Sequence, residues 1–310
     1  MSPLKAGSTE SAAHRSYLVA GHVTRDILPD RTVFGGTALY AAAMAASLGY
    51  ETRVLTSADT LEVFDFEQTP DVTVPTFHVI PSRLTTTFTY EWVEGRRIQC
   101  LTHQAGTIQG SDVPASWRDS SVWHLGPVAG EVEADIVDAI PDSAFVGVTP
   151  QGWLRSVGPD TVVSAGPWVS AERILARANA IIVSRDDLPD AQVSARDWAR
   201  WGGVVVVTEA EHGATIHWSR NSVHLEAITV DAVDELGAGD VFAVAFFDRL
   251  SRGWRPDEAG RFAIAAGSLC VSRVGPFHPP SAAEIAATAF QAEPASPANW
   301  PRVRQRSGPF

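Results

Sequence analysis

Residues 233–242 carry the clearest chemical signal in the sequence. They read Val-Asp-Glu-Leu-Gly-Ala-Gly-Asp-Val-Phe, a turn of small residues that leads directly into an apolar segment typical of a helix. The first backbone N–H groups of a helix have no partner within it, and the glycines leave these groups unshielded. The helix dipole adds to their attraction for an anion. We therefore predict an anion hole for a phosphate group at Gly237, Ala238 and Gly239.

Asp240 falls in the first turn of that helix. We expect the positive end of the helix to lower its pKa and keep the carboxylate ionised at neutral pH. A carboxylate would only repel a bound phosphate, so its position suits a hydroxyl that loses its proton while attacking a phosphoryl group. Phosphoryl transfer needs little activation of the nucleophile, so a weak base is adequate. Asp240 is thus a predicted catalytic base; a plain turn with an acidic first-turn residue is the alternative.

The composition is that of a globular protein with enough apolar material for one large core or two modest ones, since 45% of the 310 residues are hydrophobic. The formal net charge of −12 argues against binding to nucleic acid or an anionic membrane. Apolar runs stay far short of the roughly 20 residues that span a bilayer. Cys100 and Cys270 stand alone, with no CxxC motif, so we expect a cytoplasmic location.

Short β-branched runs alternate with amphipathic segments, a pattern typical of an α/β fold whose parallel sheet carries helices on both faces. The predicted strands are 16–20, 51–56, 122–125, 145–148, 180–183 and 203–208, with a hairpin at 214–218 and 222–225. The predicted helices are 36–48, 132–140, 171–178, 191–201, 238–250, 256–271 and 282–290.

Between residues 77 and 102 the alternation gives way to three β-rich runs, 77–80, 85–93 and 97–102, with a Glu94-Gly95 turn signal. They predict a small antiparallel sheet. The first fifteen residues and residues 292–310 lack periodicity, and we expect both to be loose tails around a single domain at 16–291.

Two parts of the sequence resemble the signatures of the ribokinase-like (PfkB) carbohydrate kinases. The C-terminal signature of that family is Asp-Thr-x-Gly-Ala-Gly-Asp-x-Phe, which residues 234–242 match except at Glu235. The N-terminal signature corresponds to Gly21 and Asp26, followed by Gly35-Gly36 before an alanine-rich helix. Their order and their separation of about 200 residues make the pair more specific than either alone.

The resemblance extends over residues 16–290 and implies a ribokinase-like three-layer sandwich with a central, mostly parallel sheet and a small β lid around 77–102. It implies a kinase that uses ATP and Mg²⁺ to phosphorylate a hydroxyl of a small sugar or cyclitol. The lid would exclude water from the reaction. A monomer, or a homodimer formed through the lid, is expected.

Roles on the acceptor side follow from the same resemblance. Asp26 would accept hydrogen bonds from substrate hydroxyls, and Gly35 and Gly36 would let the substrate lie against the backbone. Tyr40 stands near the position where many members carry a substrate-binding Asn, which argues against a ribose-type pocket. Gln151 would line the pocket wall.

On the donor side, the family's Asn-x-x-Glu aligns with residues 184–187. Ser184 replaces the Asn, and Asp187 keeps a carboxylate that would hold Mg²⁺ through water. Thr208 and Gly213 match the ends of the nucleotide motif, in which Ala210 replaces a glycine. Asp234 matches a carboxylate that helps some members bind a monovalent cation, so use of K⁺ is left open.

A narrower likeness to the inositol kinase branch rests on residues 21–22, 85–88, 128–131 and 151–155 together with Ser184. It implies a cyclitol acceptor such as myo-inositol, with Arg155 a further pocket candidate, although an Arg after a strand is more often a solvated surface group. A nucleoside kinase is an alternative, because Tyr40 could stack on a base. The departures at Ser184, Ala210 and Glu235 also leave a non-catalytic ligand-binding descendant open.

Overall fold

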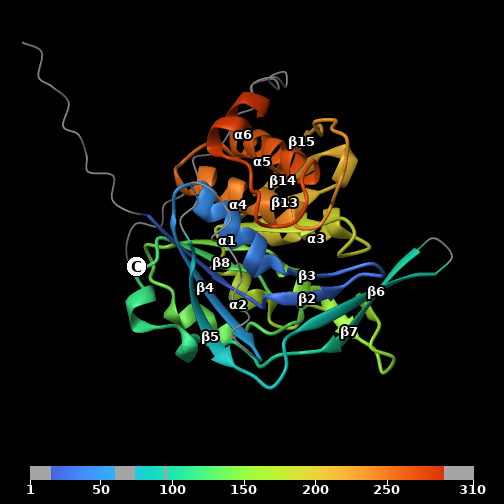
Figure 1. Ribbon diagram of the computed structural model, residues 1–310. Coiled ribbons are helices and arrows are strands. Elements are labelled where there is room, and N and C mark those ends of the chain that lie inside the picture. Colours follow the sequence, from blue (N-terminus) through green and yellow to red (C-terminus); the bar gives the residue numbers. More distant parts are fainter. Residues whose placement is uncertain (1–14, 60–73, 94–95, 290–310) are drawn as a thin grey trace, which may run out of the picture.

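The computed structural model describes residues 15–59, 74–93 and 96–289. The predicted tails at 1–15 and 292–310 lie outside these residues, except for Arg15. A nine-stranded sheet runs through the molecule in the order β15-β14-β13-β12-β9-β8-β1-β4-β5 (Figure 1). Its strands are β1 Ser16–Ala20, β4 Glu51–Ala58, β5 Thr76–Pro81, β8 Val122–Leu125, β9 Phe145–Val148, β12 Ala180–Ser184, β13 Val204–Thr208, β14 Ala214–Trp218 and β15 Asn221–Leu225.

Seven neighbouring strands of this sheet, from β13 to β5, pair in parallel, and β14 and β15 add an antiparallel hairpin at one edge. The predicted α/β class with a mostly parallel central sheet is therefore confirmed. The carboxyl ends of the parallel strands meet at one edge of the sheet, where ligands of open α/β sheets bind.

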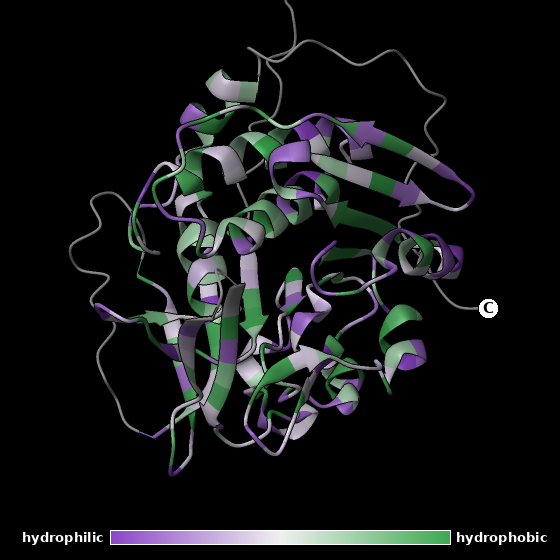
Figure 2. Ribbon diagram, turned by 90° about the vertical axis from the view of Figure 1, so that its right-hand side faces the viewer, coloured by the Kyte–Doolittle hydropathy of each residue, from purple (hydrophilic) through white to green (hydrophobic). Residues whose placement is uncertain are grey.

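Helices cover both faces, and the strand sequences show why. Side chains of a strand alternate between faces, so Tyr17 and Val19 enter one core cluster while Leu18 and Ala20 enter the other. The first cluster packs under α1 Thr37–Ser47, α4 Ala238–Ser251, α5 Pro256–Val271 and α6 Ala282–Ala289. The second packs under α2 Ala171–Leu175 and α3 Ala191–Trp198. The strands buried on both faces stand out as hydrophobic segments in Figure 2.

One predicted α-helix is wrong. Residues 132–140 form a 3-10 helix at Ala134–Ala139, because Val132 instead bridges to Ile108. Buried Ile136 and Ile140 account for the apolar spacing that suggested a helix. α2 is shorter than the predicted 171–178, and α3 passes into a 3-10 turn, Ala199–Trp201, that ends at Gly202 with φ +98°. The hairpin of β10 Arg155–Val157 and β11 Val163–Ala165 was not expected.

The second sheet is mixed rather than antiparallel, and its strands differ from those expected. It runs β3-β2-β6-β7, with β2 Thr24–Ile27, β3 Thr32–Gly35, β6 Thr87–Val93 and β7 Arg96–His103. β2 pairs in parallel with β6. The run at 77–80 belongs to β5 of the main sheet, so the small sheet does not span 77–102 as predicted. We call these four strands the small sheet; Phe88, Tyr90, Leu101 and Val128 form its own core.

Across the described ranges, none of the helices has the length and apolar character that a bilayer crossing demands.

Candidate active site

The turn before α4 has the geometry that an anion hole requires. Gly237 adopts φ +77°, and a Cβ there would lie 2.0–2.4 Å from the ring of Tyr40. Val241 donates the first helical hydrogen bond to Gly237 O at 2.9 Å. In the described part of the chain, no protein group accepts a hydrogen bond from the N–H of Gly239 or Asp240. A Cβ on Gly239 would meet nothing within 4 Å, so the space beside Gly239 is open to a ligand.

Asp240 lies beside these amides and is half-buried. Burial raises its pKa from 3.8 to about 6, while a hydrogen bond from Thr37 and the charge of Arg155 oppose the rise and Asp187 adds to it. The expectation of a lowered pKa is therefore wrong, because desolvation outweighs the helix dipole here. A carboxylate with a pKa near 6 is still mostly ionised at pH 7 and is a better proton acceptor than an ordinary aspartate.

The glycine pair joins the small sheet to α1 and brings Asp26 close. A Cβ on Gly35 would lie 2.5 Å from Asp26 Oδ2, and a Cβ on Gly36, at φ +83°, would lie 2.4 Å from His22 O. Asp26 is buried and accepts a hydrogen bond from Thr24 Oγ1 at 3.2 Å. Thr37 follows Gly36 directly, so its hydrogen bond to Asp240 connects the acceptor-side signature with the donor-side turn.

Gln151 and Asp187 are neighbours at the carboxyl ends of β9 and β12. Gln151 Nε2 donates to Asp187 Oδ1 at 3.1 Å, and Ser184 N donates to Asp187 Oδ2 at 2.9 Å. Burial raises the pKa of Asp187, although both hydrogen bonds and the charge of Arg155 lower it. Gln151 and the backbone of Ser184 therefore hold one half-buried carboxylate.

Arg155 is not the solvated side chain that its position after a strand suggested. Its guanidinium donates to Val128 O at 2.7 Å and to Gln99 Oε1 at 3.2 Å, and it lies over the ring of Phe88. Burial lowers its pKa, while the carboxylates around it, Asp187, Glu131 and Asp26 among them, favour the charged form. Its positive charge therefore interacts with the carboxylates of Asp187, Glu131 and Asp26. Sequence reasoning placed it only as a pocket candidate.

The fit to Mg²⁺ rests on Asp187. Among the residues that the structure describes, no three His, Cys, Asp or Glu side chains gather closely enough to hold a metal ion by themselves. Mg²⁺ commonly keeps several waters and binds through one or two carboxylates plus substrate phosphates, so a lone Asp187 fits it. Asp234, the candidate for a monovalent cation, accepts a hydrogen bond from Leu236 N at 3.1 Å and lies 3.9 Å from Arg31 Nη2.

Ser184 and Thr208 are register partners at the carboxyl ends of β12 and β13, so they lie side by side at this edge of the sheet. Gly213 is different. At φ +91° it packs so tightly that a Cβ would lie 2.0 Å from Leu225 O, which gives it a structural role in the turn before β14. Ala210, in place of a motif glycine, adopts φ +50°.

Tyr40 also differs from its expected role. Its ring is 5% exposed and supports Gly237 from below, and burial raises its pKa well above the usual value. The predicted site residues gather around one edge of the main sheet, namely Asp26, Gly35, Gly36, Gln151, Ser184, Asp187, Thr208 and the 237–240 turn.

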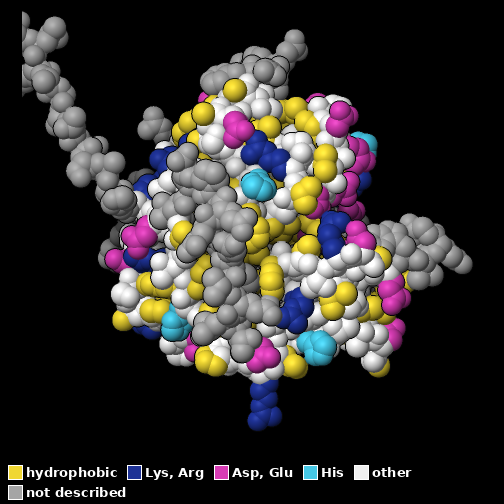
Figure 3. Space-filling view, in the orientation of Figure 1, with side chains coloured by type: hydrophobic (Ala, Val, Ile, Leu, Met, Phe, Trp, Pro, Cys, Tyr) yellow, Lys and Arg dark blue, Asp and Glu magenta, His cyan; other side chains and the backbone are white. Residues whose placement is uncertain are grey.

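On the face seen in Figure 3, acidic and basic side chains are interspersed.

A buried network that sequence reasoning missed anchors the small sheet to the main one. Glu131 accepts hydrogen bonds from the backbone N–H groups of His22, Val128 and Ala129. His22 Nε2 lies 2.8 Å from Gly106 O and its Nδ1 lies 2.6 Å from Thr86 Oγ1. Because a carbonyl only accepts, Nε2 carries a proton. Both His22 and Glu131 are fully buried.

The C-terminal part of the chain matches a known family model. Residues 174–283 match the pfkB family carbohydrate kinase model, and this range includes the 184–187, 208–213 and 234–242 segments. Among curated proteins, the bifunctional protein HldE of Bradyrhizobium diazoefficiens is 40% identical over 97 residues, and an ATP-dependent ribose-1-phosphate kinase of Halopiger xanaduensis is 34% identical over 84 residues. These matches cover 30% and 27% of this chain, and only 19% and 28% of the relatives.

Solved structures share the whole fold. A pyrophosphate-dependent myo-inositol-1 kinase converted by mutation into a myo-inositol-3 kinase aligns with a TM-score of 0.73 and 20% identity, over 89% of this chain and 99% of the other. Thermotoga maritima ribokinase gives 0.67 and 18% identity over 89% and 99%. A putative ribokinase II of E. coli with ATP and Mg²⁺ gives 0.68 and 16% over 90% and 100%. The ribokinase-like resemblance is thereby confirmed at the level of the fold.

Proposed function

We propose that this chain, which carries a pfkB family carbohydrate kinase region on a ribokinase-like fold, is a kinase of a small sugar or cyclitol. One observation carries the proposal. The carboxylate of Asp240, with a pKa of about 6, lies next to two backbone amides that have no protein acceptor, at the start of a helix. This arrangement puts a proton acceptor beside a binding site for the phosphoryl group that is transferred.

The proposed reaction needs only the acceptor hydroxyl, the phosphoryl donor and the Asp240 carboxylate to balance its bonds and its proton. The acceptor hydroxyl gives its proton to Asp240, and its oxygen forms a bond to the terminal phosphorus of the donor. The bond from that phosphorus to the bridging oxygen breaks, and the leaving phosphate takes the electron pair. The N–H groups of Gly239 and Asp240 stabilise charge on the transferred group, and the hydrogen bond from Thr37 orients the carboxylate.

The acceptor would lie between the small sheet and the edge of the main sheet. Asp26 accepts hydroxyl hydrogen bonds there, and the lack of a Cβ at Gly35 lets the Asp26 carboxylate lie against the backbone, so the glycine pair makes room for this carboxylate rather than directly for the substrate. Arg155 and Gln151 offer donors to ring oxygens or hydroxyls. Solved myo-inositol kinases of the same fold support a cyclitol as the first acceptor to try.

Two donor classes fit the anion hole. ATP with Mg²⁺ is supported by the ATP complexes of similar ribokinases, and Asp187 would hold the ion through water. Pyrophosphate is supported by similar structures that use it. The departures at Ala210 and Ser184 lie on the nucleotide side of the site, so the choice of donor has to be measured. K⁺ dependence is measured in the same assays.

The test is a matrix of donors and acceptors. ATP and pyrophosphate are each combined with myo-inositol, ribose, fructose and adenosine, and phosphorylated product is followed by ³¹P NMR. We expect one donor and one polyol to give turnover that Asp240→Asn removes. Binding of a polyol without product for any donor would support the non-catalytic alternative instead.

The nucleoside alternative loses the observation that suggested it. Tyr40 is buried under Gly237, so the face of its ring is not free to stack on a base. Adenosine in the acceptor panel checks this directly, and phosphorylation of adenosine above the polyols would reinstate that alternative.

A further inference from the structure

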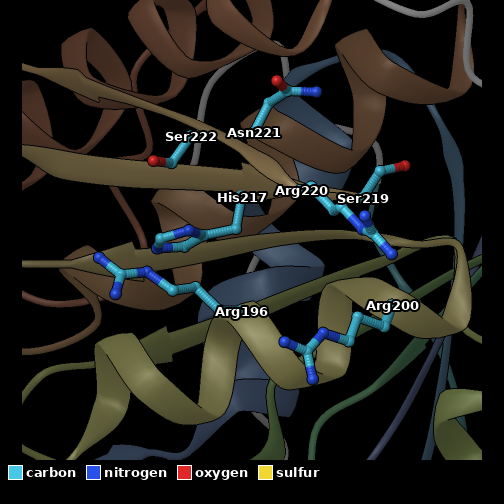
Figure 4. Close-up of a pocket in the computed structure, with 7 residues that line it drawn as sticks. All are labelled: Arg196, Arg200, His217, Ser219, Arg220, Asn221 and Ser222. Atoms are coloured by element: carbon cyan, nitrogen blue, oxygen red, sulfur yellow. The ribbon is translucent and has the colours of Figure 1, made fainter.

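A small pocket lies near the amino end of β13, whereas the candidate active site lies at the carboxyl ends of the parallel strands. It has a volume of about 160 Å³ and lies between the β14–β15 hairpin and the end of α3 (Figure 4). Trp218 of β14 pairs with Val204 at the start of β13, whereas Thr208 ends β13 at the active-site edge. At about 3.3 Å per residue the two ends are roughly 13 Å apart. The lining residues are Arg196, Arg200, His217, Ser219, Arg220, Asn221 and Ser222.

The pocket concentrates positive charge in a protein whose formal net charge is −12. Arg200 pairs with Asp197 at 2.9 Å, but in the described ranges no carboxylate lies within 4.0 Å of Arg196 or Arg220. Basic residues at the end of a helix complement its dipole, which accounts for Arg196 and Arg200. It does not account for Arg220, which the hairpin brings to the same pocket. Guanidinium groups bind the oxygens of phosphate with good geometry.

His217 adds an unsatisfied polar atom to the pocket wall. The side chain is 1% exposed, and no group hydrogen-bonds to its Nδ1. Its Nε2 lies 2.6 Å from Gln192 Oε1, and Gln192 Nε2 donates to Glu209 Oε1 at 3.1 Å. A carboxylate only accepts, so the Gln192 amide must face Glu209, and His217 Nε2 must carry the proton. The orphaned Nδ1 is therefore an acceptor that lacks a donor.

We propose that this pocket binds inorganic hydrogen phosphate, and that its occupancy is relayed to the 208–213 turn of the active site. The arginines hold the phosphate oxygens, and a P–OH group of the ligand donates to Nδ1 of His217. Hydrogen phosphate carries such a hydroxyl, whereas sulfate does not.

The relay follows from the hydrogen-bond chain that leaves His217. Gln192 connects it to Glu209, which also accepts a hydrogen bond from Thr215 Oγ1 at 2.9 Å and donates its N–H to Gly213 O at 2.8 Å. Glu209 is thus part of the turn that the nucleotide motif occupies. A ligand that reorients His217 changes the partner of Gln192, and through it the anchor of this turn.

The binding test uses the full-length protein labelled with ¹⁵N-histidine, with the His217 signals assigned from the His217→Gln variant. Titration with inorganic phosphate at pH 8 is compared with ribose 5-phosphate, a monoester whose dianion has no P–OH at this pH and should bind more weakly. We expect a saturable shift of His217 Nδ1, weakened about tenfold or more in the Arg196→Gln/Arg220→Gln variant. Arg118→Gln is the matched control, an exposed arginine also without a described carboxylate partner. No saturable shift, or an equal shift in the double variant, overturns the site.

Sulfate tests the hydrogen-bonding role of His217. At pH 8 we expect sulfate to bind about tenfold more weakly than phosphate, because it cannot donate to Nδ1. Burial and the charge of Arg196 lower the pKa of His217, while Glu209 raises it. As pH falls and the imidazole takes up a proton, Nδ1 becomes a donor and the two anions should converge. Equal affinity at pH 8 overturns this role. The charged groups around the ring are Arg196, Asp197, Arg200, Glu209 and Arg220.

The relay test compares affinity for the donor with and without phosphate. Phosphate also competes at the anion hole, but it does so equally in wild type and in the Arg196→Gln/Arg220→Gln variant, so any difference between them reports the pocket. We expect phosphate to change donor binding more in wild type, and Gln192→Leu to remove the difference. Identical responses overturn the relay. The NMR titration needs no turnover, so it stands even where the proposed kinase activity fails.

Discussion

The donor side and the acceptor side of the candidate active site are built in different ways. On the donor side, the proposed anion hole consists of backbone amides from a few consecutive residues, with Gly237 in a left-handed conformation. On the acceptor side, Asp26, Arg155 and Glu131 come from distant segments, and buried hydrogen bonds hold them in place. We infer that the donor side depends on local backbone geometry, whereas the acceptor side depends on a side-chain network.

The largest effect is expected for Asp240→Asn, at the junction of the two sides. Loss of the proton acceptor should lower kcat by about 10²-fold or more while donor binding is kept. Because burial raises the pKa of Asp240, the folded state holds that proton more tightly than the unfolded state, so this contribution to stability is lost as pH rises through about 6. The free energy of unfolding of the neutral variant should therefore be about 1–2 kcal/mol higher than that of the wild type at pH 7. Turnover near that of wild type contradicts the assignment.

The next effect tests the acceptor-side network through Glu131→Gln. An amide offers one acceptor oxygen where the carboxylate receives hydrogen bonds from His22, Val128 and Ala129, and it adds donors that face other donors. We expect a loss of about 3 kcal/mol in chemical denaturation. Glu133→Gln is the control, since that side chain is exposed and makes no described hydrogen bond. Equal stability of the two variants would show that the network contributes nothing.

Gly237→Ala tests the donor side, with Gly239→Ala as its partner. At Gly237 a methyl group meets both a positive φ and the ring of Tyr40, so we expect a loss of about 2 kcal/mol. At Gly239 the methyl group meets nothing within 4 Å, and alanine favours the helix, so stability should stay the same or rise by up to about 1 kcal/mol. Thermal unfolding measures both. If Gly239→Ala keeps its stability but binds the donor more weakly, the donor lies against that amide.

The smallest effect is the pH dependence of the wild type. Below a pH of about 6, Asp240 takes up a proton and can no longer accept one from the substrate. We expect kcat/KM to fall about tenfold per pH unit on this acidic limb and to level off above it. A profile with its acidic limb near pH 4 would place the base in water rather than in a desolvated site.

Prediction from the sequence succeeded where a signal is local. The Gly-Ala-Gly-Asp run predicts its own turn and helix start, and Pro256–Val271 forms a helix with the predicted bounds. The prediction failed where the structure of a segment depends on residues far away in the sequence. The β-rich run at 77–80 gives no sign of which sheet it joins, because pairing with β4 depends on residues 51–58. The apolar spacing at 132–140 likewise reports burial, not helix type.

The sequence alone determined the alternation of strands and helices and the small-residue turn that leads into α4 with Asp240 in its first turn, since each depends on residues close together in the chain. The pKa of Asp240, the burial of Arg155 and the position of Tyr40 beneath Gly237 were decided only by the tertiary structure. The physical reason is that desolvation and charge pairing depend on what surrounds a group in space, and those surroundings come from segments far away in the chain.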